Sequence, residues 1–307
     1  MAERQLSYLP GEAPALTRDS TLADAAGPFV EYLREEGKTA NTIKAFNSDL
    51  NVMKRYFGAG ARLGSFTTTR LQDFMTWVEN GQGENIPCSA KSYARRVTTL
   101  KVLFKWLHET KVLPIDPARA VPQRSISAPL QPILSEDEID RLLAETARRR
   151  FAEKNPDARP ELLVRLLLDT GIKKSECMNV RPDDIRREGP GAPVLHVRRR
   201  TARDVYKERK IRLNPDWLEV LDEYLEQYRP PDRIFNCTAR NLEYVLTDLA
   251  EAAAIPAVSF EMLRWTAAVN DFRAGMPPEE LREKLGLSRI SWRETGAKIE
   301  RLASRDV

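Results

Sequence analysis

The chain has 307 residues, 42% hydrophobic and 31% charged, which is enough apolar material for two packed domains. Its formal net charge of +4 and pI near 8.9 indicate a nucleic-acid partner only weakly. Two histidines exclude a histidine-rich metal site or a histidine-dependent triad, and the three separated cysteines form no metal-binding pair. We therefore expect a reducing compartment, with no metal, no cofactor and no small-molecule substrate.

Residues 1–20 contain no apolar core of signal-peptide length, and we expect them to form a flexible tail. No run of about 18 apolar residues occurs along the chain, so no membrane span is expected. Together these features predict a cytoplasmic protein.

Residues 21–113 are predicted to form a helical domain of four helices. The stretches LADAAGPFVEYLREEG, KTANTIKAFNSDLNVMKRYFG, FTTTRLQDFMTWVEN and SAKSYARRVTTLKVLFKWLHETK each carry apolar residues at helical spacing. In the second stretch, Thr39 is the expected N-cap, and one apolar stripe is formed by Ile43, Phe46, Leu50, Met53 and Phe57.

Two groups of polar and basic residues in this domain are candidate DNA contacts. A helix N-terminus is a natural phosphate site, although capping alone would also explain its polar residues. The longest helix carries a basic face, which could equally be a solvated surface. The candidates are Thr39, Asn41, Thr42, Lys44, Lys91, Arg95, Arg96 and Lys101.

Residues 114–133 are predicted to be a linker, because five prolines in this segment block helix formation and favour extended backbone. Arg119 and Arg124 make it positively charged, and both are candidate DNA contacts. Residues 134–307 form the predicted second domain. It opens with a capping box between Ser135 and Glu138.

The second domain is predicted to be mainly helical with one small antiparallel sheet. The alternating runs VLHVRR and ERKIRLN have the period of β-strands, and most other segments have helical spacing. The expected fold is therefore mainly α, with an α+β second domain.

The predicted strand pair carries eight basic residues between positions 198 and 212. A charged sheet edge that blocks aggregation would explain some of them, and a DNA-facing hairpin would explain them all. We chose as candidate DNA contacts Arg198, Arg199, Arg200, Arg203, Lys207 and Arg209, with Lys173 and Lys174 of the preceding helix start. For these two lysines a capping role is the alternative.

Four motifs in order resemble the tyrosine recombinase (phage integrase) family. They are KTANTIKAF, DTGIKKSECMNVRPDDI, the hairpin VRRRTARDVYKERKIRL, and the C-terminal block VSFEMLRWTAAVNDFRAGMPPEELREKLGLSRISWRETG. The resemblance implies an N-terminal SAM-like core-binding domain and a catalytic domain that enclose duplex DNA. It also implies a reaction without metal, in which a tyrosine attacks a phosphodiester held by two arginines.

Most family positions that carry this chemistry hold other residues here. Arg264 keeps its arginine and remains a candidate phosphate contact, while Trp265 follows it where the family has histidine. The remaining positions are occupied by Lys173 for arginine, Arg200 or Lys207 for the hairpin lysine, Glu261 and Leu287 for two histidines, and Gly296 for the nucleophile. Glu261 is expected to repel phosphate or to pair with Arg264.

Other hydroxyl groups lie near the missing nucleophile. Ser288, Ser291 and Thr295 precede Gly296, and the last tyrosine of the chain is Tyr244. A serine or threonine needs a base to become a nucleophile, and no histidine is available nearby.

These departures lead to three hypotheses. The first is a nucleoid-associated architectural or regulatory protein that binds double-stranded DNA without cleaving it, and therefore is not an enzyme. The second is an active site-specific recombinase or integrase with a non-standard or partner-supplied nucleophile. The third is a protein–protein interaction module that no longer binds DNA. The C-terminal segment is expected to pack in cis or to dock on a neighbouring copy.

Overall fold

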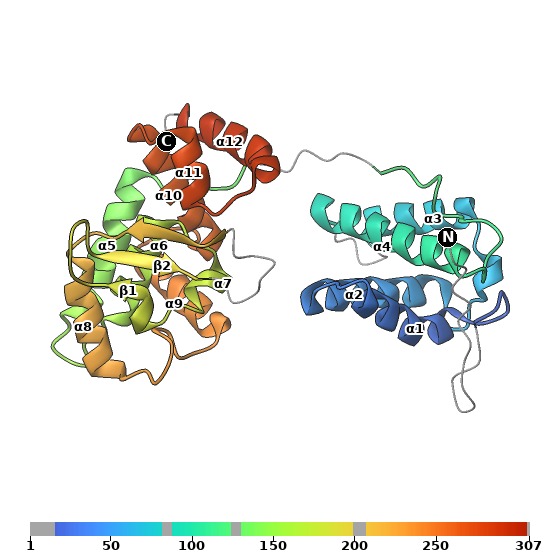
Figure 1. Ribbon diagram of the computed structural model, residues 1–307, viewed down its shortest axis with the longest axis horizontal. Coiled ribbons are helices and arrows are strands. Elements are labelled where there is room, and N and C mark those ends of the chain that lie inside the picture. Colours follow the sequence, from blue (N-terminus) through green and yellow to red (C-terminus); the bar gives the residue numbers. More distant parts are fainter. Residues whose placement is uncertain (1–15, 82–87, 124–129, 199–206, 306–307) are drawn as a thin grey trace. The chain divides into compact units, whose positions relative to one another are not determined.

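The computed structural model describes residues 16–81, 88–123, 130–198 and 207–305. The chain divides into two compact units, residues 1–129 and 130–307, and the division falls within the segment expected as a linker. Both units are largely helical, and the second adds one three-stranded antiparallel sheet (Figure 1). The predicted fold class is confirmed.

The first unit is a bundle of helices that begin at hydroxyl caps. Thr21, Thr39, Thr67 and Ser89 each accept a hydrogen bond from a backbone N–H of the following first turn. The elements are α1 (Leu22–Glu35), α2 (Ala40–Phe57), η1 (Leu63–Ser65), α3 (Thr68–Glu79) and α4 (Ala90–Glu109).

An aromatic core holds this bundle together. Phe29 of α1 lies against Trp106 of α4, with ring centroids 5.5 Å apart. The predicted stripe of α2 is confirmed, since Phe46, Leu50 and Met53 are buried and Ile43 packs against the same core. Part of the expected linker also belongs here. Ala118 and Val121 are buried in this core, so proline-rich sequence does not leave residues 114–123 unpacked.

The second unit is built around α6, a helix buried on nearly all sides. It contacts α5, α8, α9 and α10, and the expected capping box at the start of α5 joins Ser135 to Glu138. The helical elements are α5 (Glu136–Arg150), α6 (Arg159–Thr170), α7 (Lys174–Cys177), η2 (Pro182–Asp184), α8 (Trp217–Tyr228), α9 (Ala239–Ala252), α10 (Phe260–Arg273), α11 (Pro278–Lys284) and α12 (Arg289–Ala303).

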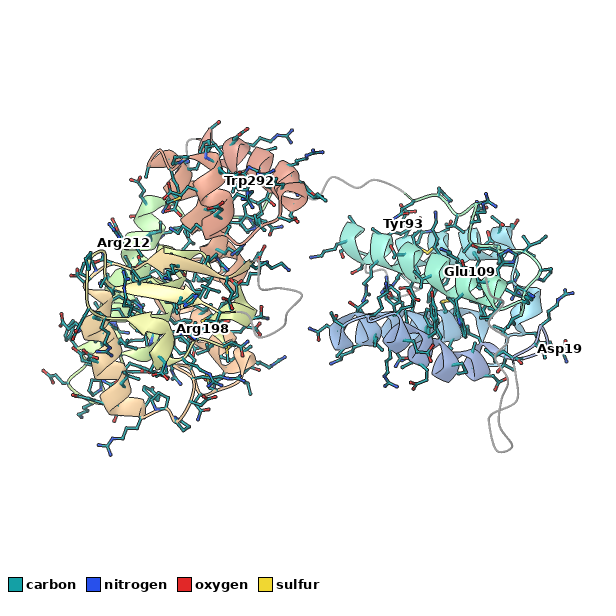
Figure 2. The ribbon with its side chains drawn as sticks, viewed as in Figure 1. Asp19, Tyr93, Glu109, Arg198, Arg212 and Trp292 are labelled. Carbon is teal, nitrogen blue, oxygen red and sulfur yellow. The ribbon has the colours of Figure 1, made fainter. Side chains whose placement is uncertain are left out.

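The sheet has the order β1-β2-β3, from β1 (Ile185–Arg186), β2 (Val194–Val197) and β3 (Arg209–Arg212). Leu195 pairs with Ile211 on the core side, and the next pair, His196 with Lys210, is on the opposite face. Arg198, just after β2, and Arg212, at the end of β3, therefore lie at opposite ends of the sheet (Figure 2).

The C-terminal helix α12 packs in cis. Ile299 and Leu302 share a buried cluster with Ala268 and Val269 of α10 and Leu281 of α11. The start of the second unit joins the same region, because the backbone N–H of Leu134 donates to Thr266 Oγ1 at 2.9 Å. Of the two arrangements expected for this segment, the structure shows the intramolecular one. Among the described residues no helix is long and apolar enough to span a membrane.

Candidate nucleic-acid interface

Five of the positions singled out by the family motifs surround one hollow of about 210 Å³ in the second unit. The start of α7 contributes Lys173, α10 contributes Glu261, Arg264 and Trp265, and the turn after α11 contributes Leu287. The other lining residues are Ala268, Leu285, Thr295 and Ile299. Residues more than a hundred positions apart in sequence thus converge on one small cavity with cationic and apolar walls.

Backbone carbonyls hold Arg264 in place. Its guanidinium donates to the carbonyl of Gly171 and, at 2.8 Å, to that of Leu285. Gly171 has a positive φ of 56°, and an added Cβ would lie 3.1 Å from the Leu285 side chain. The glycine therefore permits the close approach of α6, α10 and α11, and this approach orients the arginine that lines the hollow.

Glu261 is held by the residue one turn later on α10. The Trp265 indole Nε1–H donates to Glu261 Oε1 at 2.9 Å. The two residues stand where the resemblance expects histidines, and in this chain they bond to each other. Glu261 is expected to repel phosphate or to pair with Arg264, and its hydrogen-bond partner is instead the tryptophan.

The lysines at the start of α7 differ in their surroundings. The Lys173 backbone N–H donates to Glu176 Oε2 at 2.9 Å, so this position does cap the short helix, while its side chain lines the hollow. Lys174 is exposed and its Nζ lies 2.7 Å from Glu243 on α9. The Glu176 carboxylate thus caps the N–H of Lys173, and Lys174 pairs with a surface carboxylate.

Arg209 does not face solvent, contrary to the expectation for the basic hairpin. Its side chain is 8% exposed and donates to both carboxylate oxygens of Glu176, at 3.1 and 2.9 Å. Its Nε–H donates to the Lys284 carbonyl at 2.6 Å. Because side chains alternate along a strand, Arg209 shares the inner face with Ile211. This alternation was the signal in the sequence that could have identified it.

Two larger hollows adjoin the first one. A hollow of about 350 Å³ shares Glu261 and Arg264 with it and continues along α9 past Lys174, Glu243 and Thr247. A hollow of about 580 Å³ shares Leu287 with it and lies between β3 and α11. We call these three the hollow row. Its basic lining residues outside the central hollow are Lys174, Lys207, Arg209, Lys210, Arg212, Arg282 and Lys284.

The remaining hairpin candidates are divided by the described range. Arg198 is exposed and its Nε lies 2.8 Å from Asp184, whereas Lys207 lines the 580 Å³ hollow. Arg124, Arg199, Arg200 and Arg203 lie outside the described residues. Of the two candidates for the hairpin lysine, only Lys207 can therefore be placed.

In the first unit, a buried aspartate orients two of the candidate DNA contacts. Asp49 is 2% exposed and accepts hydrogen bonds from Arg95 at 2.8 Å and from the Thr99 hydroxyl at 2.8 Å. Arg96 Nε lies 3.5 Å from the same carboxylate. Burial raises the pKa of Asp49, while the Thr99 hydrogen bond and the two arginines oppose that rise. Sequence analysis missed Asp49, because no local pattern marks its partners.

The other candidates of the first unit lie at the surface or near it. Thr39 and Thr42 share a hydrogen bond at the start of α2, where Thr39 also caps the helix. Lys101 is half-buried on α4. The exposed candidates are Asn41, Lys44, Lys91 and Arg119.

The position of the missing nucleophile is closed by a neighbouring ring. Gly296 is buried in α12, and a Cβ there would lie 3.0 Å from the Trp292 ring one turn earlier (Figure 2 labels Trp292). Thr295, the residue before it, lines the central hollow. Of the three hydroxyl-bearing residues near Gly296, Thr295 thus lines the hollow at which the motif positions meet, although its hydroxyl donates to the Ser291 carbonyl at 2.9 Å.

Family models match both units of the chain. "Phage integrase, N-terminal SAM-like domain" matches residues 27–111, and "Phage integrase family" matches residues 132–294. The chain belongs to the phage integrase family, that of the tyrosine recombinases. The resemblance inferred from four short motifs is confirmed, as is the expected pairing of a SAM-like domain with a catalytic-type domain.

Curated relatives match over most of their length. Tyrosine recombinase XerD of Listeria monocytogenes serotype 4b (strain F2365) is 24% identical over 301 residues, covering 92% of this chain and 97% of the relative. Tyrosine recombinase XerC of Roseiflexus sp. (strain RS-1) is 24% identical over 286 residues, covering 87% of each.

Solved structures share the fold at lower identity. XerH recombinase in a post-cleavage complex with a palindromic difH substrate matches with a TM-score of 0.74 and 16% identity, over 95% of this chain and 97% of that chain. A lambda integrase dimer bound to a COC′ core site matches with a TM-score of 0.71 and 17% identity, over 94% and 81%.

The prediction that this chain is not an enzyme is wrong. It rested on exchanged residues at the motif positions, whereas the relatives that match almost end to end are tyrosine recombinases. The hollow is lined by Lys173, Arg264, Glu261 and Thr295, which are residue types that phosphate chemistry uses.

Proposed function

We propose that this chain binds duplex DNA and takes part in site-specific recombination through a reorganised strand-cleavage site. The observation that carries the proposal is the central hollow, where Lys173 and Arg264 lie together at the middle of the hollow row. Two cations within one cavity of about 210 Å³ suit a phosphodiester, which carries one negative charge.

The chemistry of this pair differs from that of two arginines. A lysine offers a compact charge without the planar fork of a guanidinium, so Lys173 holds a phosphate oxygen with less directional control. Arg264 keeps the fork, and its backbone partners fix the plane in which it points. We infer that Arg264 orients the phosphate and that Lys173 mainly neutralises it.

Basic residues of both units support binding to a long polyanion. Lys91 is exposed on α4, and Lys210 and Arg212 are exposed on the outer face of β3. Contacts of this kind bind the DNA backbone without reading its sequence. Two of the similar structures are the XerH recombinase bound to its palindromic difH substrate and a lambda integrase dimer bound to a COC′ core site. We therefore propose that more than one copy assembles on DNA.

A binding assay over several salt concentrations tests this proposal. Fluorescence anisotropy of a labelled random-sequence duplex with the full chain should show affinity that falls steeply as salt rises. Lys91→Glu and Lys210→Glu should each weaken binding. The matched control is Lys154→Glu, the same charge change at an exposed lysine in the loop between α5 and α6.

The interpretation as a protein–protein module makes the opposite prediction. Without DNA binding, the anisotropy would stay at the value of free DNA at low salt. An equal loss of DNA affinity in the Lys154→Glu control would show a general effect of net charge. That result would count against the proposed DNA-binding surface.

A further inference from the structure

We propose that Thr295 is the nucleophile of this chain, attacking a DNA phosphodiester with Glu261 as its general base. The inference rests on the proposed function, because it needs duplex DNA in the hollow row. It adds a residue and a chemical step to that function. The observation behind it is that Thr295, Glu261, Lys173 and Arg264 all line the same hollow of about 210 Å³.

The structure separates Thr295 from the other two hydroxyls of this segment. Ser288 caps α12, where its Oγ accepts the Ser291 backbone N–H at 3.2 Å. The two serine hydroxyls lie 3.1 Å apart. Neither serine lines the central hollow, although Ser288 does line the neighbouring one of about 580 Å³. Thr295 alone of the three lies where Lys173 and Arg264 also lie.

A threonine hydroxyl attacks only when a base takes its proton. Among the residues that the structure describes, Glu261 is the one carboxylate that lines the central hollow, and Trp265 holds its Oε1 through a hydrogen bond of 2.9 Å. That bond fixes the carboxylate on α10 beside the cations. Trp265 thus positions the carboxylate. Glu261, which stands where the family has a histidine, supplies the base that the Thr295 hydroxyl needs.

Attack requires one local change in Thr295. Its Oγ1–H now donates to the Ser291 carbonyl at 2.9 Å, the usual bond of a threonine to the preceding helical turn. Rotation about χ1 exchanges that bond for one toward the hollow. Since threonine populates two χ1 positions in helices, the exchange is a small rearrangement.

The step balances without an added reagent. Thr295 Oγ1 forms a bond to phosphorus as its proton passes to Glu261, and the phosphorus–oxygen bond to one deoxyribose breaks. The Lys173 ammonium donates a proton to the departing oxygen, while Arg264 holds the non-bridging oxygens. The product is a threonine phosphodiester and a free deoxyribose hydroxyl. The reverse step rejoins a strand without any energy source, as strand exchange requires.

The test uses the full chain with a pool of randomised duplexes that carry nicks at varied positions. The pool is first enriched for binding by the chain. A nick next to the attacked phosphate lets the freed fragment diffuse away, so a covalent adduct accumulates. Denaturing gels detect the adduct, and mass spectrometry of the digested adduct should place the nucleotide on Thr295.

Variants then identify the groups involved. Thr295→Ala should reduce the adduct by about 10³-fold or more, while Thr295→Ser retains it and Ser291→Ala, the matched control, leaves it unchanged. Glu261→Gln should slow formation by about 10²-fold, because an amide cannot take the threonine proton.

Two results would overturn the inference. One is a DNA pool that binds but yields no adduct. The other is an adduct that survives in Thr295→Ala at its full yield. Absence of binding by any duplex is a different outcome, since it would reject the proposed function and the inference with it.

Discussion

Arg209 on β3 and Glu176 on α7 form a buried pair that ties the sheet to the turn bearing Lys173. The carboxylate accepts two hydrogen bonds from the guanidinium and a third from the Lys173 backbone N–H. Through this one glutamate, the second strand of the basic hairpin and Lys173 of the central hollow share a fixed geometry. The pair therefore supports the position of a candidate phosphate contact without touching the phosphate.

Breaking this pair should destabilise the second unit strongly. Glu176→Gln leaves the Arg209 charge buried without its counter-ion, and loss of one partner of such a pair costs about 3–5 kcal/mol. Scanning calorimetry should show the unfolding transition of the second unit moving to lower temperature, while that of the first unit stays unchanged. Lys210→Ala, at the exposed neighbour of Arg209, is the control and should change stability by less than about 0.5 kcal/mol. A Glu176→Gln protein with an unaltered melting profile would contradict this.

Asp49 should make the stability of the first unit depend on pH. Burial raises its pKa in the folded state above the ordinary value of about 3.9. The folded state then binds more protons than the unfolded state between those two pKa values, so stability falls as pH rises through that window. The difference in unfolding free energy between wild type and Asp49→Asn should thus shrink as pH rises from about 3.5. It should level off once the pH exceeds the pKa of Asp49 in the folded state.

The measurement is scanning calorimetry over this pH range, read from the unfolding transition of the first unit. That transition is the one that does not respond to Glu176→Gln. A difference that grows with pH over the same window would mean that the arginines outweigh burial. The direction of the Asp49 pKa shift would then be the reverse of that stated.

Glu261→Gln should tighten duplex binding while it slows any covalent step. The carboxylate lies among Lys173 and Arg264 and repels a phosphate that enters the same hollow. Its neutralisation should improve affinity roughly two- to five-fold at low salt, as for an exposed charge pair. Glu251→Gln, at an exposed position near the end of α9, is the control and should leave affinity unchanged. Weaker binding by Glu261→Gln would show that the carboxylate organises the cations.

Gly296 and Trp292 should be energetically coupled. Alanine is favoured over glycine within a helix by about 1 kcal/mol, but a Cβ at 296 meets the Trp292 ring at 3.0 Å. We expect Gly296→Ala to stabilise the protein in a Trp292→Ala background and to give little or no gain in wild type. A double-mutant cycle from urea unfolding should return a coupling of about 0.5–1 kcal/mol or more. Strictly additive effects would contradict the packing described here.

Much of the fold was predictable because its determinants are local. The Ser135–Glu138 capping box and the stripe of α2 involve residues within a few turns of each other, and helical geometry alone connects them. The family motifs also singled out Lys173, Glu261, Arg264 and Leu287, and in the structure these residues line one hollow.

Other features depended on partners that sequence spacing does not reveal. Asp49 lies 46 positions from Arg95, and Glu176 lies 33 positions from Arg209. Both arginines were expected at a DNA surface, because the sequence shows their charge and does not show that each one pairs with a buried carboxylate. The Glu261–Trp265 bond is local, one turn along α10, yet an arginine was the more obvious partner for a carboxylate.

The Trp292 ring beside Gly296 also constrains how position 296 can change in evolution. The Cβ of a larger side chain there would lie 3.0 Å from the indole, so the tryptophan must shift or be replaced by a smaller residue. Substitutions at the two positions are therefore linked. Laboratory evolution that selects a tyrosine at 296 should recover a smaller residue at 292 before that change or together with it.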